Sequence, residues 1–267
     1  MRTLKVLAAV ALATLVFAAP AYAITNGTPD GNAHPQVGVV VAEAHGGRHY
    51  FCSGTLLSPT VFLLAAHCDI SFLQPTGLWV YFSATQPDPN TISAGDLHAG
   101  TFFADPAFKP NAGGKTGGLD DHDIAVILLD SPVNGVAPAS LPPAGLLDQL
   151  ASKNGLHDAV FTNVGYGASG YSQGGGPPNL EFAGLRMDSS STFMSLENAY
   201  LRLSENQATG NGGTCNLDSG GPQFLGDSNM LVSITVDGDR YCTALDINYR
   251  LDTPSARSFL GQYVPVP

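Results

Sequence analysis

Short runs of β-branched and aliphatic residues, each closed by a turn residue, recur along most of this 267-residue chain. Helical periodicity is scarce: residues 145–153 predict one or two turns, and residues 254–263 predict a short terminal helix capped by Thr253. We therefore expect an all-β barrel fold. The runs with the clearest strand character are 36–41, 78–82, 124–129, 159–164 and 230–236.

The first 23 residues are typical of a secretory signal peptide. Arg2 and Lys5 precede an apolar stretch from Val6 to Ala18, and the segment ends in the small-residue sequence Ala-Tyr-Ala. The apolar stretch is shorter than the roughly 20 residues that span a bilayer, so we expect no membrane anchor. We predict cleavage after Ala23, which would release residues 24–267 as a secreted domain.

Composition narrows the choice of partners and cofactors. The net charge is −11, and the signal segment holds two of the 11 basic residues, so nucleic acid is not an expected partner. The four cysteines all lie in the exported part, where an oxidising compartment favours two disulfide bonds. Their spacing matches no zinc motif, so we expect neither a metal nor another cofactor. These cysteines are Cys52, Cys68, Cys215 and Cys242.

The segment that most suggests chemistry is Cys215-Asn-Leu-Asp-Ser-Gly-Gly-Pro222, a glycine-rich turn that would expose Ser219. A serine hydroxyl becomes a nucleophile when an imidazole takes its proton and a carboxylate orients that imidazole. Of the seven histidines, only His67 follows an apolar run, from Val61 to Ala66, and adjoins a cysteine. We therefore take His67 as the candidate base for Ser219.

Several motifs, in order along the chain, resemble those of chymotrypsin-like serine proteases. Leu64-Ala-Ala-His67-Cys68 is similar to the histidine motif of that family, and Asp123-Ile-Ala-Val-Ile-Leu128 to its aspartate strand. Asp218-Ser-Gly-Gly-Pro222 is similar to its nucleophile motif, and Val164-Gly-Tyr-Gly167 to its Gly-aromatic-Gly strand. Residues 249–260 look like the last strand and helix of bacterial secreted members. The resemblance implies a secreted serine endopeptidase with a triad of His67, Asp123 and Ser219.

The same resemblance implies a fold and a set of partners. Its members are built from two six-stranded antiparallel β-barrels with the active site in the cleft between them, and here the halves would span residues 24–135 and 136–267. It also implies the disulfide bonds Cys52–Cys68 and Cys215–Cys242. We expect polypeptide substrates, protein inhibitors of proteases as a second class of partner, and a monomer.

Two further features of the family concern how the active form is ordered. In relatives the new α-amino group turns inward and pairs with the Asp before the nucleophile, which implies a pair between Ile24 and Asp218. The backbone N–H groups of Leu217 and Ser219 would form the oxyanion hole. Leu217 stands where relatives have Gly, and a side chain there resists the required backbone angles.

The substrate pocket departs further from the family pattern. Counting six residues back from Ser219 puts Gly213 at its base, which is then uncharged where trypsin-like members carry Asp. Val236 and Gly238 would line the pocket, and Val236 stands where relatives usually have Ser. Asp246 could align with a pocket wall and restore a carboxylate. Charged and apolar preferences both stay open.

Other interpretations are weaker. Leu217, Val236 and Asp237 favour a protease-like protein that binds a partner without cutting it, whereas three intact triad residues favour the enzyme. The sequence Gly170-Tyr-Ser-Gln-Gly174 matches the nucleophile elbow of α/β-hydrolases, but Gly-Gly-Pro-Pro follows it where that elbow needs a helix. Asp120, Asp121 and Asp123 could attract calcium, but a solvated loop that leads into the aspartate strand accounts for them better.

Overall fold

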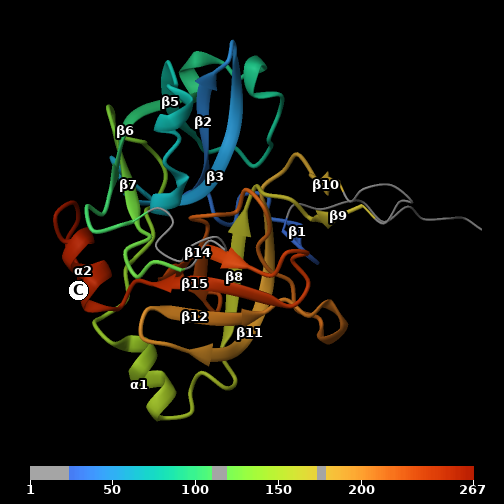
Figure 1. Ribbon diagram of the computed structural model, residues 1–267, viewed down its shortest axis with the longest axis vertical. Helices are drawn as coiled ribbons and strands as arrows, with labels where there is room; N and C mark the ends of the chain where they lie inside the picture. The colour runs from blue at the N-terminus through green and yellow to red at the C-terminus, as the bar shows by residue number, and fades with distance from the viewer. Residues whose placement is uncertain (1–23, 110–118, 173–178) are drawn as a thin grey trace, which may run out of the picture.

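The computed structural model describes residues 24–109, 119–172 and 179–267, so the expected signal peptide lies outside the described residues. The first half of the chain closes into a six-stranded antiparallel barrel in the order β2-β3-β4-β7-β6-β5 (Figure 1). Its strands are β2 (Val37–Ala44), β3 (Gly47–Ser58), β4 (Val61–Leu64), β5 (Gly77–Tyr81), β6 (His98–Ala104) and β7 (Ala125–Leu129).

The second half forms a second antiparallel barrel, drawn below the first in Figure 1. Its strands pair in the order β11-β12-β15-β14-β13-β8, and the pairing of β8 with β11 closes the ring. The predicted fold of two six-stranded barrels is therefore confirmed. The strands are β8 (Val160–Gly165), β11 (Met187–Leu196), β12 (Tyr200–Ser204), β13 (Pro222–Leu225), β14 (Leu231–Gly238) and β15 (Leu245–Arg250).

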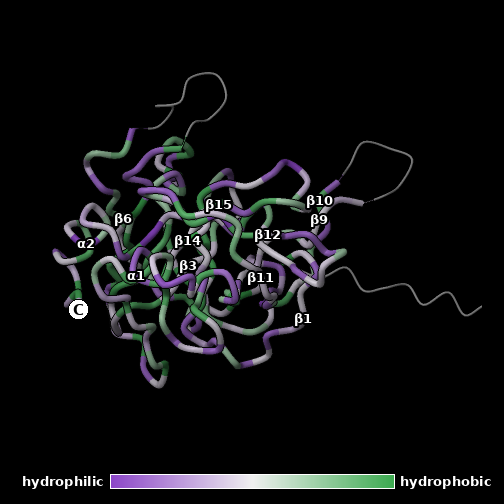
Figure 2. The backbone as a smooth tube through the Cα atoms, turned by 90° about the horizontal axis from the view of Figure 1, so that it is seen from below, coloured by the Kyte–Doolittle hydropathy of each residue, from purple (hydrophilic) through white to green (hydrophobic). Residues whose placement is uncertain are grey.

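Two small β elements accompany the second barrel. β1 (Thr28–Pro29) adds to the edge of β11, so the start of the described chain belongs with the second barrel. β9 (Gly170–Tyr171) and β10 (Leu180–Glu181) form a separate hairpin. The two views agree that this hairpin and β1 lie on the side of the molecule opposite the C-terminus (Figures 1 and 2).

Helices are short, as the sequence predicts. α1 (Leu146–Ser152) falls in the connection between the barrels, and α2 (Pro254–Leu260) begins at Thr253, whose hydroxyl accepts a hydrogen bond from the Ala256 amide at 3.3 Å. None of the helices in the described residues has the length and apolar character needed to span a bilayer. The 3-10 turns are η1 (Ala66–Cys68), η2 (Ser71–Leu73), η3 (Pro89–Thr91), η4 (Ala94–Asp96) and η6 (Gln207–Thr209).

The barrel interiors explain the continuous apolar runs in the sequence. Consecutive residues Val39, Val40 and Val41 of β2 are all buried, although their side chains alternate between the two faces of the strand. One face points into the first barrel, and the other is covered because β2 also lies against β8 of the second barrel. A strand buried on both faces needs apolar residues at successive positions, which is the pattern of β2 from Val37 to Ala42.

Two disulfide bonds lie beside the segments that carry His67 and Ser219. Cys52 of β3 bonds to Cys68 of η1, and Cys215 bonds to Cys242. Both predicted pairings are confirmed. The first bridge ties the turn that carries His67 to the barrel wall, and the second joins two cysteines 27 positions apart, with Ser219 between them.

A buried ion pair holds the N-terminal segment on the second barrel. Arg186 is fully buried, and its Nε donates to Asp30 Oδ2 at 2.7 Å. The guanidinium also donates to the carbonyls of Gly31 and Val37 and to the Tyr166 hydroxyl. Burial alone would raise the pKa of Asp30, but hydrogen bonds from His34 and Arg186 lower it overall. Each of the three guanidinium nitrogens thus donates at least one hydrogen bond.

This arrangement predicts that Arg186→Met destabilises the protein by about 3–5 kcal/mol, because it leaves the Asp30 carboxylate buried without its main cation. Arg202→Met is the matched control, since Arg202 pairs with the half-exposed Glu197 and should matter by less than about 1 kcal/mol. Urea unfolding of the three proteins measures both effects. Equal losses in the two variants would show that the buried pair is not special.

Candidate active site

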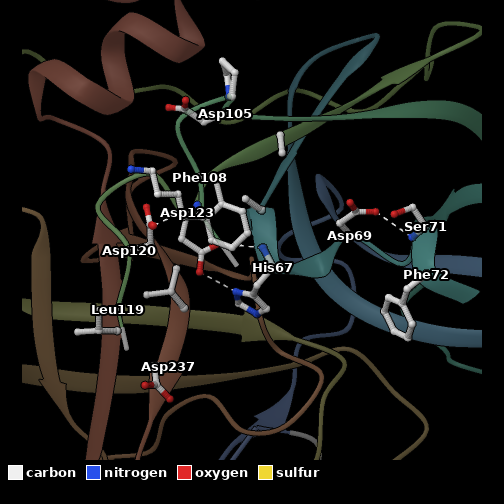
Figure 3. Close-up of a pocket in the computed structure, with 15 residues that line it drawn as sticks. His67, Asp69, Ser71, Phe72, Asp105, Phe108, Leu119, Asp120, Asp123 and Asp237 are labelled. Atoms are coloured by element: carbon white, nitrogen blue, oxygen red, sulfur yellow. Dashed lines mark hydrogen bonds and ion pairs between the residues drawn. The ribbon is translucent and has the colours of Figure 1, made fainter. Parts of the chain in front are cut away.

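His67 and Asp123 come together because the strands that precede and follow them are neighbours. β4 pairs with β7 so that Leu64 faces Ala125, which puts η1 beside the residue that enters β7. His67 Nδ1 lies 2.7 Å from Asp123 Oδ2, and the His67 amide donates to Asp123 Oδ1 at 2.9 Å (Figure 3). The carboxylate therefore fixes both the backbone and the ring of His67, and Nδ1 is the nitrogen that carries the shared proton.

Ser219 lies across a cavity of about 380 Å³ that His67 also lines. The turn that carries it is fastened to β14, because the Gly220 amide donates to the Thr235 carbonyl at 2.8 Å and the Thr235 amide to the Gly221 carbonyl at 2.9 Å. Within the described residues the Ser219 hydroxyl makes no hydrogen bond. The structure thus brings an unengaged hydroxyl and an oriented imidazole to the same cavity.

Asp218, beside Ser219, points inward and is fully buried. Its Oδ1 accepts from the Gly167 amide at 2.8 Å and from the Ser53 hydroxyl at 3.4 Å, while Oδ2 accepts from the Cys215 amide at 3.0 Å. Burial raises the pKa of Asp218 to about 7, although these hydrogen bonds act in the opposite direction. A charged Asp218 would therefore gain from a cation placed beside it.

Leu217 adopts a backbone conformation that side chains disfavour. Its φ is 74°, in the left-handed region that glycine occupies readily. The turn imposes this angle, and its neighbours Asp218 and Cys215 are buried and hydrogen bonded. The amides of Leu217 and Ser219 donate to no other described residue. The two amides expected to form the oxyanion hole are thus unengaged within the described residues.

Ile24 lies in the same region as Asp218, although no hydrogen bond or ion pair joins them in the described chain. Ile24 is fully buried against Met187, and Met187 pairs with Gly165 across β11 and β8. A methyl group on Gly165 would lie 2.0 Å from Asp218 Oδ1, so that glycine is in contact with the carboxylate. The pair between Ile24 and Asp218 therefore stays a prediction.

Of the four residues expected in the substrate pocket, Val236 and Gly238 line the cavity that holds Ser219, whereas Gly213 and Asp246 do not. Thr214 lines this cavity as well. Gly213 pairs with Thr25 through backbone hydrogen bonds of 2.9 and 3.2 Å. Asp246 faces Gly238 across β14 and β15.

Gly213 itself is uncharged, as the sequence indicates, but a buried carboxyl group lies directly against it. A methyl group on Gly213 would lie 2.3 Å from Glu205 Oε1, so the Glu205 carboxyl group fills the space beside that glycine. Glu205 belongs to no catalytic motif, and motif matching missed it. Strand alternation could have found it, because Leu201, Leu203 and Glu205 share one face, and the two leucines are fully buried.

A second, larger cavity of about 780 Å³ opens on the other side of His67. Phe72 and Asp69 border it from one side, and Phe108, Leu119 and Asp120 from the other (Figure 3). Val236 and Asp237 line both cavities, so the two cavities adjoin at the end of β14. The arrangement leaves room for an extended chain to lie across His67.

The rival sites gain no support. Ser172 sits in the β9–β10 hairpin, where its amide donates to the Asn179 carbonyl at 2.8 Å, and the last two residues of its Gly170–Gly174 motif lie outside the described residues. Asp120 accepts from the amides of His122 and Lys109, which is the behaviour of a loop carboxylate. No group of three metal-binding side chains occurs in the described ranges.

The two-barrel fold and the oriented histidine define the class, and a comparison with family models identifies the family. The trypsin family model matches residues 25–256. The chain therefore belongs to the trypsin family. Among solved structures, HL collagenase, determined at 1.7 Å resolution, is similar with a TM-score of 0.63 and 17% sequence identity, over 90% of this chain and 97% of that one. At this identity the likeness shows the shared fold.

The strained angle at Leu217 predicts that Leu217→Gly raises the free energy of unfolding by about 0.5–1 kcal/mol, because relief of the left-handed strain exceeds the entropy that glycine adds to the unfolded chain. Leu217→Val should lower it by about 1 kcal/mol, since a β-branched residue fits this region worst. Guanidinium unfolding at fixed pH gives both values. A glycine variant less stable than the parent would mean that Leu217 contributes packing that outweighs strain.

Proposed function

We propose that this protein is a secreted serine endopeptidase that cleaves peptide bonds through an acyl-enzyme intermediate. The observation that carries the proposal is the short contact between His67 and Asp123, combined with Ser219 on the wall of the same cavity as His67. Membership of the trypsin family supports polypeptides as the substrate class. Secretion is supported by the character of residues 1–23 and by the two disulfide bonds.

In the proposed mechanism His67 removes the proton of the Ser219 hydroxyl as the oxygen attacks the carbonyl carbon of the substrate. Asp123 holds the ring so that its other nitrogen faces the serine and stabilises the imidazolium that forms. The amides of Leu217 and Ser219 stabilise the oxyanion. His67 then gives its proton to the leaving amine, and water releases the acyl group by the same steps in reverse order.

The alternative is a protease-like binding protein, which the strained Leu217 and the replacement at Val236 favour. Val236 cannot donate a hydrogen bond to Asp123, whose two oxygens are both bonded to His67. That pairing already satisfies the carboxylate, so the loss of a third donor is compatible with turnover. Labelling by a fluorophosphonate, which needs an activated serine, separates the two functions.

The proposed mechanism predicts that Ser219→Ala abolishes peptide hydrolysis and fluorophosphonate labelling, because the attacking oxygen is lost. The melting temperature of this variant should not change. Asp123→Asn should lower kcat about 10⁴-fold through loss of tautomer control. Ser172→Ala is the matched control and should leave both readouts unchanged. Hydrolysis that survives in Ser219→Ala would refute the proposal.

The proposed mechanism also predicts that activity needs a free α-amino group on Ile24. A chain that retains Ala23 should be folded but at least about 100-fold less active, because the oxyanion turn is then not held by a cation at Asp218. N-terminal sequencing of the secreted protein checks the cleavage site. Full activity in the form that retains Ala23 would show that the turn is ordered by other contacts.

The pH dependence of stability gives an independent test of the proposed pair between the Ile24 α-amino group and Asp218. Without a cation, burial raises the pKa of Asp218 to about 7 from its ordinary value of 3.8. The folded state then keeps a proton that the unfolded state loses, so stability falls as pH rises from about 4 to about 7. We expect this fall in the form that retains Ala23 and a smaller one in the form that begins at Ile24. In an Asp218→Asn background the two forms should behave alike.

A further inference from the structure

The carboxylate of Asp123 takes its hydrogen bonds from His67 alone. Within the described residues, its two oxygens accept from the His67 amide at 2.9 Å and from the His67 ring at 2.7 Å, and from no third residue. Its position therefore has to come from the main chain of the loop that leads into β7. In that loop the Asp123 amide donates to the Asp120 carbonyl at 3.0 Å. The next amide, that of Ile124, donates to the His122 carbonyl at 2.8 Å. The placement of Asp123 thus depends on its neighbour His122.

The ring of His122 contacts two elements outside this loop. Its Nδ1 lies 3.2 Å from Asp105 Oδ2, just after β6, and 3.1 Å from Ser255 Oγ, in the first turn of α2. An ionised carboxylate only accepts hydrogen bonds, so Nδ1 carries the proton and shares it between the two oxygens. The proton of the Ser255 hydroxyl is then free to point to the Asp121 carbonyl oxygen, 3.5 Å away. One side chain thus joins the loop to the first barrel and to the C-terminal helix.

Both partners of His122 are themselves held in place. Asp105 is buried, its amide donates to the Ile124 carbonyl at 2.9 Å, and its Oδ1 accepts from the Ala107 amide at 2.9 Å. Ser255 belongs to α2, which lies on the same side of the molecule as β6 in both views (Figures 1 and 2). Neither anchor can therefore follow His122 if the loop shifts.

The second barrel holds the same loop one residue earlier. Tyr249 of β15 is fully buried, and its hydroxyl donates to the Asp121 carbonyl at 2.8 Å. The Asp120 carboxylate closes the loop from within, because its Oδ1 accepts from the His122 amide at 2.9 Å. Residues 121 and 122 are thus fastened to β15, to α2 and to the end of β6, and Asp123 follows them directly.

Neither stability nor substrate contact accounts well for this arrangement. The side chain of His122 is 39% exposed, and a partly exposed pair of this kind contributes little to stability. His122 and Ser255 are not among the residues that line the two described cavities beside His67. Catalysis is far more sensitive to position, since a displacement of about 1 Å in a reacting group can cost about 100-fold in rate.

We propose that His122 is a positioning residue that holds Asp123 in the orientation required by His67, with Asp105 and Ser255 as its two anchors. This inference rests on the proposed peptidase function, in which Asp123 orients the catalytic base. His122 touches neither the substrate nor the reacting atoms, so it acts only through the main chain that it shares with Asp123. The C-terminal helix becomes, through Ser255, part of the support of the triad.

Kinetics of four proteins test this role. His122→Ala should lower kcat about tenfold or more with KM changed by less than about twofold, because the base is misplaced and the substrate contacts are kept. Its melting temperature should fall by no more than about 4 °C. His122→Asn places an amide nitrogen near the position of Nδ1 and should restore kcat to within about threefold of the parent. His157→Ala is the matched control, since His157 pairs with the exposed Asp158, and it should change neither constant.

Proton NMR tests the geometry without turnover, in a Ser219→Ala background. The proton that His67 shares with Asp123 gives a low-field signal, which is assigned by its loss in His67→Ala. Adding His122→Ala should broaden or shift this signal, and His122→Asn should restore it. If His122→Ala does not fold, Ser255→Ala removes a single hydroxyl group and should shift the same signal and lower kcat about threefold.

The two measurements separate the positioning role from the peptidase function. An unchanged signal together with an unchanged kcat in the folded alanine variants overturns the inference and leaves the peptidase intact. A loss of kcat that His122→Asn does not restore, with the signal unmoved, also overturns it. A parent that neither cleaves peptides nor reacts with fluorophosphonate, but whose low-field signal depends on His122, rejects the peptidase and retains the positioning role.

Discussion

The burial of one carboxylate, that of Asp218, constrains the active-site turn more than any other interaction. A buried carboxylate must find donors, and this one takes them from three places: Ser53 in the first barrel, Gly167 after β8, and Cys215 in its own turn. These contacts fix the main chain on both sides of Asp218. Leu217 and Ser219 are therefore positioned by a side chain that itself never reaches the cavity.

Close packing around this turn requires glycine at positions 167 and 220. A methyl group on Gly167 would lie 2.4 Å from Asp218 Oδ2, so only glycine gives the carboxylate room. Gly220, with φ of 79°, approaches the first barrel so closely that a methyl group would lie 2.7 Å from the Ser53 carbonyl oxygen and the Ala65 nitrogen. The turn that carries Ser219 therefore packs directly against the segment that leads to His67. That contact between barrels brings together a serine and a histidine that are more than 150 residues apart in sequence.

Much of this architecture could be predicted from the sequence, because the information is local. Buried strands such as β2 and β7 are apolar runs bounded by turn residues, and the Thr253 cap marks α2. The motifs around His67, Asp123 and Ser219 also identify residues that the structure gathers at two adjoining cavities. Both disulfide pairings followed from the resemblance to chymotrypsin-like proteases. Each of these inferences needs only neighbouring residues or a fixed order of motifs.

What could not be predicted depends on side chains that meet from distant strands. Arg186 and Asp30 are 156 residues apart, and neither lies in a recognisable motif, so their buried ion pair is invisible before the chain folds. The angle at Leu217 could be suspected from the missing glycine, but its adoption of φ 74° needed the structure. The closure of the second barrel through β8 and β11 is likewise a long-range pairing that strand patterns do not specify.

Glu205 shows why matching residues by position can miss a buried carboxyl group. The sequence at Gly213 predicts an uncharged base, and that inference is correct for the residue itself. A carboxyl group is nevertheless present, because β12 delivers Glu205 into the volume that a side chain at 213 would need. A side chain at 213 and the side chain of Glu205 would clash, so glycine at 213 leaves the space that Glu205 fills. Side chains from any strand that borders the space beside Gly213 can occupy it, so every such strand has to be considered.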